Sequence, residues 1–248
     1  MPKPHRARFI ALTTLLARRR PDVDAATIAA GRVLVDGRLL TNPLARVRVD
    51  ASIRVLSSRR LRGDVKLSYA LDTLTVPVAD RVVVDVGASA GGFTTALLDR
   101  GARRVYAVDV GVGLLVGRLR NERRVLNLEG HNLGSLSREV IPDVVELITM
   151  DLSYLALAEA VPQLERLDLH VAADLVGLVK PTFELHRATV ARTDADVVHA
   201  VELATERINN AGWTVVNTCD APATGQRGAR EAFIHARRSR RASVVRRG

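Results

Sequence analysis

The stretch VVVDVGASAGGFT, residues 82–94, decides the fold of this 248-residue chain. It begins with a mostly apolar run typical of a buried strand, and the run enters a glycine-rich turn that opens a helix. Such a turn lets a ligand approach the backbone closely, because glycine carries no side chain. Taken alone, this pattern is compatible with any nucleotide-binding α/β fold.

The spacing of the glycines narrows the choice of cofactor. The stretch lacks both the G-x-G-x-x-G spacing of NAD-binding turns and the lysine of a phosphate-binding P-loop. An acid, Asp85, stands instead two residues before Gly87, and a carboxylate suits a cofactor with cationic amino and sulfonium groups. The pattern D-x-G-x-x-x-G-G resembles motif I of the class I methyltransferases, which use S-adenosylmethionine. The resemblance implies cofactor contacts from Asp85, Gly87, Ala88, Ser89, Gly91, Gly92 and Phe93.

The next two predicted strands also end in polar residues. The second strand ends in Asp109, where a carboxylate would hold a ribose diol, and the third ends in Glu129 with Asn132 shortly after it. We expect Glu129 and Asn132 near the edge of the adenine. The alternative is a structural glycine turn with an exposed aspartate.

Apolar runs and helical patterns alternate from residue 82 onward. This alternation predicts a Rossmann-like α/β fold with a mostly parallel sheet that is covered on both faces. The predicted strands are 82–86, 104–110, 125–128, 144–150, 174–179, 213–218 and 231–236, and the predicted helices lie near 92–100, 113–120, 156–166 and 194–211.

The first 56 residues have a different, α+β pattern. They predict a basic helix at 6–19, a second helix at 24–30 with Asp24 as its cap, a hairpin that turns at Asp36-Gly37, and a strand at 53–56. The apolar face of the first helix would consist of Phe9, Leu12, Leu15 and Leu16. The stretch AAGRVLVDGRLLTNP, residues 29–43, resembles the S4 RNA-binding domain. A structural or protein-binding role for this unit is the alternative.

Charge is unevenly distributed along the chain. Residues 1–62 have a net charge of +10 and residues 237–248 a net charge of +6, whereas residues 63–236 have a net charge of −6. Basic ends on an acidic body favour contact with a polyanion such as RNA. A disordered tail combined with an arginine-rich codon bias would give the same distribution.

Lysine is rare in this chain. Of 37 basic residues 34 are arginine, and the three lysines are Lys3, Lys66 and Lys180. Arginine does not release its proton in proteins, whereas lysine can do so when its pKa is lowered. An internal lysine is therefore a candidate for proton chemistry, unless it survived by drift.

Four residues are candidates for catalysis. Asp151 and Lys180 follow the fourth and fifth predicted strands, at the edge of the sheet where open α/β sheets bind ligands. Lys66 precedes the sheet region and Glu231 begins the last predicted strand. The motifs RGDVKL, DLSY, LVKPTFE and GARE, which contain these residues, resemble the TlyA-type (haemolysin-A-like) ribosomal RNA methyltransferases of the FtsJ-like group. The resemblance implies a catalytic tetrad of Lys66, Asp151, Lys180 and Glu231, and 2′-O-methylation of cytidine in ribosomal RNA.

The chemistry of this reaction suits the four candidates. A ribose hydroxyl is a poor nucleophile, and its proton must leave as the methyl group arrives. We expect Lys180 to take that proton, because a neighbouring cation such as Lys66 and partial burial would lower its pKa from about 10.4. Asp151 and Glu231 would orient the lysines and the hydroxyl. We expect no metal, because the sulfonium is already an activated leaving group and the six histidines are scattered.

These motifs predict four regions: an S4-like RNA-binding domain at 1–58, a linker at 59–65, an FtsJ-like methyltransferase domain at 66–238 and a basic tail at 239–248. No apolar run approaches the ~18–20 residues of a membrane span. We expect a cytoplasmic monomer, and the resemblance implies that it acts on ribosomal RNA or ribosomal subunits. A single cysteine, Cys219, excludes an internal disulfide and is expected to be an idle thiol.

Three other functions stay open at this point. The first is a non-catalytic S4-domain factor that binds RNA or the ribosome. The second is a membrane-lytic protein, and the third is a methyltransferase that acts on protein or a small molecule. The basic ends of the chain disfavour the third of these.

Overall fold

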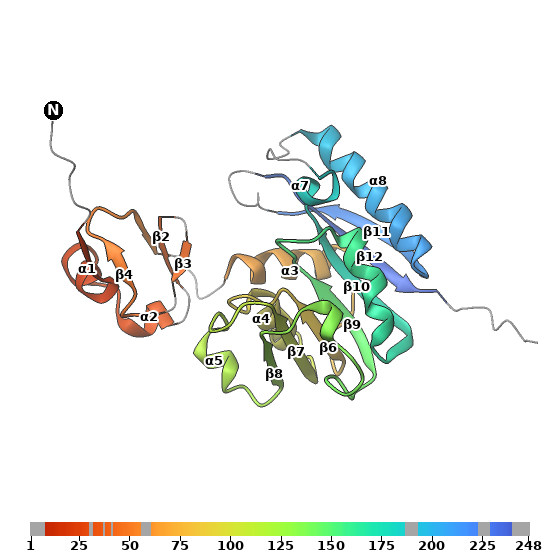
Figure 1. Ribbon diagram of the computed structural model, residues 1–248, viewed down its shortest axis with the longest axis horizontal. Coiled ribbons are helices and arrows are strands. Elements are labelled where there is room, and N and C mark those ends of the chain that lie inside the picture. Colours follow the sequence, from red (N-terminus) through yellow and green to blue (C-terminus); the bar gives the residue numbers. More distant parts are fainter. Residues whose placement is uncertain are drawn as a thin grey trace, which may run out of the picture.

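The computed structural model describes residues 8–29, 32–36, 38–40, 42–55, 61–186, 193–222 and 229–239 (Figure 1). Their apolar side chains form three buried clusters. One cluster lies wholly within the first 55 residues, and the other two share the large sheet of the remaining chain. The predicted glycine of the first hairpin, Gly37, and the basic tail from residue 240 lie outside the described residues.

The N-terminal unit combines two small antiparallel sheets with two helices. Strand β1 pairs with β4, and β2 lies between β3 and β5. Asp24 caps α2, since its Oδ1 accepts a 2.7 Å hydrogen bond from the Thr27 N–H. The elements are β1 (Phe9–Ala11), α1 (Leu12–Arg19), α2 (Ala25–Ala29), β2 (Val33–Val35), β3 (Arg38–Leu40), β4 (Arg46–Arg48) and β5 (Ile53–Val55).

The first predicted helix starts later than its apolar pattern indicates. Leu12, Leu15 and Leu16 are buried as expected, but Phe9 belongs to β1 and is 47% exposed. Phe9 is opposite Arg48 of β4, so ladder hydrogen bonds hold this segment extended. The expectation that Phe9 lies on the helix was wrong, because pairing with a distant strand outweighed the local periodicity.

The remainder of the chain is built around a seven-stranded sheet in the order β11-β12-β10-β9-β6-β7-β8. The five strands from β10 to β8 are parallel, and β12 pairs antiparallel with both β10 and β11. A mostly parallel α/β sheet was predicted and is confirmed. The strands are β6 (Val82–Val86), β7 (Arg104–Asp109), β8 (Val125–Glu129), β9 (Val145–Met150), β10 (Leu169–Val179), β11 (Trp213–Asp220) and β12 (Ala232–Arg238).

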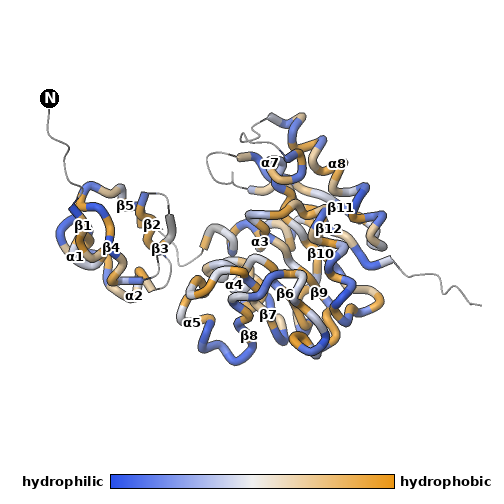
Figure 2. The backbone as a smooth tube through the Cα atoms, viewed as in Figure 1, coloured by the Kyte–Doolittle hydropathy of each residue, from blue (hydrophilic) through white to orange (hydrophobic). Residues whose placement is uncertain are grey.

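Side chains alternate between the two faces of this sheet. Val82, Val84 and Val86 of β6 belong to the buried cluster that contains Leu157 and Leu164, whereas Val83 belongs to the cluster that contains Leu67 and Phe93. Figure 2 shows hydrophobic segments along the central strands and hydrophilic segments in many of the surrounding loops. The helices are α3 (Arg62–Thr73), α4 (Gly92–Asp99), α5 (Gly117–Arg120), η1 (Leu133–Ser135), α6 (Leu157–Ala160), η2 (Val161–Arg166), α7 (Pro181–Glu184) and α8 (Asp194–Asn210).

Two predicted boundaries differ from the structure. The C-terminal part of the expected linker at 59–65 is helical, because α3 begins at Arg62 and packs against α4. The helix expected at 113–120 is limited to α5, because Gly113 has a φ of +78° and the backbone N–H groups of Leu114 and Leu115 donate to the Glu129 carboxylate.

The contact between α3 and α4 depends on a glycine pair. A Cβ on Gly92 would lie 2.9 Å from the Cα of Gly63 and 3.1 Å from the backbone nitrogen of Asp64. Both neighbours are backbone atoms and cannot rotate away. Gly92 therefore sets how closely α3, which carries Lys66, approaches α4.

We predict that Gly92→Ala destabilises the protein by about 1–3 kcal/mol, because the added methyl group overpacks this contact. Gly117→Ala is the control, since a Cβ at that helical position meets no atom within 4 Å. Alanine should be neutral or stabilising there. Chemical denaturation of both variants measures the effect, and equal stabilities would show that the α3–α4 contact is not tight.

Candidate active site

Three candidate residues project from the same face of the sheet. Leu147 of β9, Leu178 of β10 and Phe233 of β12 all face α3 and α4. Because side chains alternate along a strand, Asp151, Lys180 and Glu231 have the same parity and face the same layer. The location of these residues at strand ends and the alternation of side chains along the strands therefore direct their side chains toward α3, the helix that carries Lys66.

The four candidates form two ion pairs. Lys66 Nζ contacts Glu231 Oε2, and both side chains are largely buried. Lys180 Nζ lies 2.5 Å from Asp151 Oδ1, with the two side chains 19% and 28% exposed. The second contact is an ion pair outside the angles of a hydrogen bond, since Asp151 Oδ1 has no hydrogen-bond partner.

The register of β10 and β12 makes the two ion pairs neighbours. Val179 lies opposite Ala232, so Lys180 and Glu231 occupy the next pair of positions. Directly opposed residues of antiparallel strands have Cβ atoms roughly 5 Å apart on the same face. The sequence prediction that the four residues lie in one region is therefore supported by the sheet geometry.

A cavity of about 250 Å³ opens beside the Lys180–Asp151 pair. The glycine-rich turn forms one wall, and a Cβ on Gly87 would lie 2.4 Å from the carbonyl oxygen of Asp151. The cavity is lined by Val86, Gly87, Ser89, Val108, Asp109, Val110, Leu114, His131, Leu133, Asp151, Leu152, Ser153, Tyr154 and Lys180.

Asp109 lies at the end of β7 and lines this cavity, where the sequence analysis expected it. Its Oδ2 accepts a 2.8 Å hydrogen bond from the Ser89 N–H, and its Oδ1 accepts one of 2.8 Å from the Gly111 N–H. The two bonds fix the carboxylate. Each oxygen keeps a second lone pair that a diol can use.

Asp85 is placed differently from the expectation. It is fully buried beneath the turn, and its two oxygens accept hydrogen bonds from Thr94 Oγ1 (2.6 Å) and Thr149 Oγ1 (2.9 Å). Burial raises its pKa to about 6, although the two hydroxyl donors oppose the rise. Asp85 thus connects β6, β9 and α4, and it does not line the cavity.

Glu129 and Asn132 also have structural partners. Asn132 caps η1 by accepting a hydrogen bond from the Ser135 N–H. Glu129 forms an ion pair with Arg120 and accepts from the Leu114 and Leu115 N–H groups. Burial alone would raise the pKa of Glu129, but the hydrogen bonds outweigh it and lower the pKa to about 2.

The remaining residues of the turn separate into two groups. Gly87 and Ser89 line the cavity, whereas Ala88 and Phe93 are buried in the layer of α3 and α4. Gly91 caps α4 with a φ of +89°, and a Cβ there would overlap the Leu119 side chain. Of the predicted cofactor residues, Gly87, Ser89 and Asp109 therefore reach the cavity.

The sequence analysis missed several residues of the cavity wall. Leu114, Leu133 and Val110 provide an apolar side, and His131 and Tyr154 are polar. Their only signal in the sequence is position, since Val110 ends a predicted strand and the others lie a few residues beyond the end of one. An apolar side chain at such a position is indistinguishable from a core residue without the fold.

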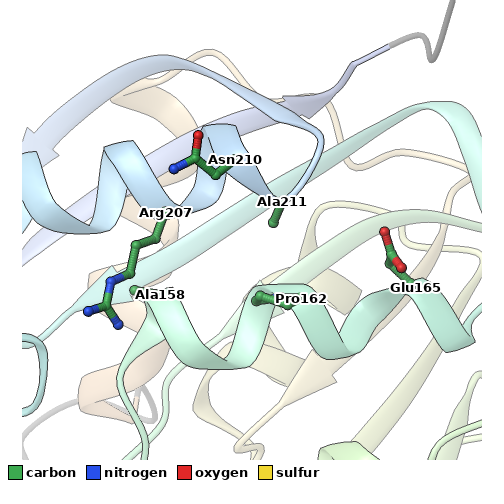
Figure 3. A pocket seen from close by; sticks show the side chains of 6 residues that line it. All are labelled: Ala158, Pro162, Glu165, Arg207, Asn210 and Ala211. Carbon is green, nitrogen blue, oxygen red and sulfur yellow. The ribbon is translucent and has the colours of Figure 1, made fainter.

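A larger hollow of about 410 Å³ lies elsewhere, between the α6–η2 segment and the C-terminal end of α8 (Figure 3). Arg207 and Glu165 lie toward opposite ends of it, and none of the candidate residues lines it. Its size therefore does not mark the active site. Cys219 does not line the cavity, and burial and Asp220 raise the pKa of its thiol to about 11 and keep it protonated.

Metal-binding clusters and membrane-spanning helices are both absent from the described residues. No group of three or more His, Cys, Asp or Glu side chains in these segments could hold a metal ion. Within the same part of the chain, no helix is long and apolar enough to cross a membrane.

Comparison with protein families gives one match over most of the chain. Residues 59–238 match the FtsJ-like methyltransferase model. A protein of Mycobacterium tuberculosis named 16S/23S rRNA (cytidine-2′-O)-methyltransferase TlyA is 39% identical over 88% of this chain and 84% of its own length. Hemolysin A of Brachyspira hyodysenteriae is 32% identical over 84% of this chain and 90% of its own.

Solved structures agree with these matches. A Streptococcus thermophilus protein that bears a hemolysin name superposes with a TM-score of 0.71 and 26% identity, covering 94% of this chain and 90% of its own. An S-adenosylmethionine-dependent methyltransferase from Mesorhizobium loti has a TM-score of 0.50 and 14% identity, covering 68% and 96%. The second likeness shows the fold.

The burial of Asp85 predicts a pH-dependent effect on stability. Its folded pKa of about 6 lies above the ordinary value of 3.8, so folding favours the protonated form. The stability that this group contributes is present below pH 4 and is lost as the pH rises to 6, by about 3 kcal/mol in total. Asp85→Asn removes this loss, so the variant should gain stability relative to the parent between pH 4 and pH 7.

Denaturant unfolding at several pH values measures this difference. Asp143→Asn is the control with the opposite sign, because hydrogen bonds from Tyr106 and Arg104 lower the pKa of Asp143. That variant should be less stable than the parent by a nearly constant amount between pH 4 and pH 7, and the difference should shrink only as the pH falls below 4. A difference between Asp85→Asn and the parent that does not change with pH would contradict the burial of an ionisable Asp85.

Proposed function

Because this chain belongs to the FtsJ-like methyltransferase family, we propose that it transfers a methyl group from S-adenosylmethionine to a ribose 2′-hydroxyl of RNA, with cytidine in ribosomal RNA as the target. The observation that carries the proposal is the Lys180–Asp151 ion pair in the wall of the cavity, beside the Lys66–Glu231 pair. The name of the Mycobacterium tuberculosis relative supports the choice of cytidine and ribosomal RNA.

The lining of the cavity suits S-adenosylmethionine. Asp109 offers carboxylate oxygens to a ribose diol, and Leu114 and Leu133 offer an apolar surface to an aromatic base. Gly87 and Ser89 present backbone at the turn, and Asp151 brings a negative charge to the side where a sulfonium would lie. The bound cofactor supplies an activated methyl group on its sulfonium.

Lys180 acts as the general base in the proposed mechanism. The 2′-hydroxyl oxygen would gain the methyl group as the bond between the methyl carbon and sulfur breaks and the neutral thioether leaves, and the hydroxyl proton would pass to Nζ of Lys180. The base must be a neutral amine, so Lys180 first releases its own proton. RNA that covers the cavity removes the water that stabilises an ammonium, and Asp151 keeps the amine directed toward the hydroxyl.

Lys66 and Glu231 orient the acceptor ribose. Lys66 is 8% exposed and Glu231 7% exposed, and each neutralises the other. A buried pair of this kind contributes little net stability, because desolvation offsets the attraction, but it holds its side chains in one geometry. We assign this pair to positioning and the Lys180–Asp151 pair to proton transfer.

The N-terminal unit is proposed to bind the RNA substrate, with residues 1–58 as an S4-like domain ahead of the catalytic domain. Its separate apolar core supports an independent unit, and residues 1–62 carry a net charge of +10. Phosphate contacts by arginine side chains supply affinity without sequence preference. The catalytic domain and the cavity then select the nucleotide.

Two other functions are less well supported. A non-catalytic RNA-binding factor would not require two lysine–carboxylate pairs beside a cavity that suits the cofactor. A lytic activity has the support of the Brachyspira hyodysenteriae relative's name, but no described feature of this chain carries it. Methyl transfer explains the paired charges, the cavity and the family together.

We predict that Lys180→Arg abolishes methyl transfer and leaves the fold and RNA binding intact. Arginine keeps the positive charge but does not act as a base. The assay is transfer of labelled methyl groups from S-adenosylmethionine to ribosomal RNA, followed by nucleoside analysis for 2′-O-methylcytidine. The loss should exceed 100-fold, which is the lower range of the contribution of general-base catalysis.

The matched control is Arg118→Lys, an exchange of one cation for the other on α5, outside the cavity lining. It should leave the rate unchanged. Near-normal activity of Lys180→Arg would refute the general-base role. A base-methylated product would overturn the ribose chemistry and leave the methyltransferase fold standing.

Removal of residues 1–60 tests the RNA-binding role of the N-terminal unit. The shortened chain should lose most of its RNA affinity but retain its affinity for S-adenosylmethionine, because the cavity lies wholly within residues 86–180. RNA binding by the full chain should also fall steeply with salt, since phosphate contacts release counterions. Filter binding and calorimetry measure the two affinities, and equal RNA binding by both chains would assign the RNA surface elsewhere.

A further inference from the structure

We infer that Glu184 is a positioning residue for methyl transfer, which holds the segment after Asp151 against the segment that carries Lys180. The inference rests on the proposed function. Glu184 does not line the cavity, and its carboxylate accepts its hydrogen bonds from the backbone of α6. It acts instead through the backbone segments that carry Lys180 and Asp151.

The first link ties Glu184 to Lys180. Lys180 is the N-cap of α7, and its carbonyl oxygen accepts hydrogen bonds from the Phe183 N–H (2.9 Å) and the Glu184 N–H (3.1 Å). Pro181 at the first helical position restricts the backbone of this turn. Any displacement of Glu184 therefore moves Lys180.

The second link ties Glu184 to α6. The Glu184 side chain is buried, and its Oε1 accepts a 2.5 Å hydrogen bond from the Leu157 N–H. Its Oε2 accepts a weaker bond of 3.4 Å from the Ala158 N–H. These are the first two N–H groups of α6, which need a partner because a helix leaves its first N–H groups unsatisfied.

The residue that caps α6 indicates that the cap does more than stabilise this helix. A Ser, Thr, Asp or Asn at position 156 would cap α6 locally, but Ala156 stands there and makes no side-chain cap. The cap comes instead from a residue 27 positions away along the chain. Burial raises the pKa of the Glu184 carboxyl group, so this arrangement costs free energy that a local cap would avoid.

The segment between Asp151 and α6, which Glu184 holds at one end, is short. Only residues 152–156 separate Asp151 from α6, and the Asp151 N–H donates a 3.0 Å hydrogen bond to the Val86 carbonyl at the start of the segment. With the sheet at one end and Glu184 at the other, the segment has little freedom. Ser153 and Tyr154 within it line the cavity. Glu184 thus fixes the spacing between the Lys180 amine and the Asp151 carboxylate.

Glu184→Gln tests this role while preserving the size and one acceptor oxygen of the side chain. We expect kcat for 2′-O-methylation to fall at least tenfold and the Kd for S-adenosylmethionine to change less than twofold. The pH profile of kcat should also change, because the exchange alters the spacing between the Lys180 amine and the Asp151 carboxylate. Other charged groups near Glu184 are Glu159 on α6 and Arg207 on α8, and both are unchanged.

The matched control is Asp143→Asn. Asp143 also accepts two hydrogen bonds, from Arg104 Nη1 (2.7 Å) and Tyr106 Oη (2.8 Å), but it lies just before β9 at the opposite end of the sheet from Asp151. The melting temperatures of both variants show how much each exchange affects the fold. The change in kcat and in its pH profile should occur only in Glu184→Gln.

The possible results distinguish a failure of this inference from a failure of the proposed function. If the parent chain forms no 2′-O-methylated nucleoside, the proposed function fails. If the parent is active and Glu184→Gln matches Asp143→Asn in kcat and pH profile, Glu184 is only a helix cap and the inference is overturned. Glu184→Asp, which keeps the charge but is one methylene shorter, gives a second comparison and should lie between the parent and Glu184→Gln.

Discussion

The contact between the glycine-rich turn and the end of β9 is the constraint on which the site depends. Gly87 approaches the Asp151 carbonyl so closely that any side chain at position 87 would displace it, and the Asp151 N–H is bonded to Val86. The wall of the proposed cofactor cavity and the carboxylate of Asp151 therefore belong to one backbone unit. A shift of either by an ångström would change the distance between methyl donor and acceptor, and catalysis by proximity does not tolerate such a shift.

The buried charged groups of this domain hold side chains and backbone segments in place and contribute little to the stability of the fold. Lys66–Glu231 and Lys180–Asp151 place four ionisable groups near one sheet edge, and Asp85 lies beneath them with only hydroxyl donors. Desolvation makes such groups expensive, and apolar residues of similar size would stabilise the fold at least as well. Each of these groups instead fixes the position of a backbone segment or of a side chain in the proposed active site. Asp85 joins β6, β9 and α4, and Glu184 joins α7 to α6 in the same manner.

The sequence predicts where strands end but not what each polar residue contacts. Asp85, Asp109 and Glu129 all stand at strand ends, and spacing alone assigns all three to the cofactor. Alternation along β6 directs Asp85 under α4, and the turn before α5 places two N–H groups on Glu129, so only Asp109 reaches the cavity. Most of the sheet follows from local apolar runs. The first strand, β1, does not, because its partner β4 lies 37 residues away in the chain.

The two ion pairs explain why lysine stands at positions 66 and 180 of a chain in which arginine is otherwise preferred. Lys66 and Lys180 each direct a compact ammonium at a single carboxylate oxygen in a largely buried position. A guanidinium presents five donors in a rigid plane, and in these positions several of them would be left without partners, at about 1–3 kcal/mol each. For Lys66, only 8% exposed, this geometric demand suffices to exclude arginine without any role in proton transfer. For the more accessible Lys180 the packing demand is weaker, so the retention of lysine at position 180 argues more strongly for a group that must lose its proton.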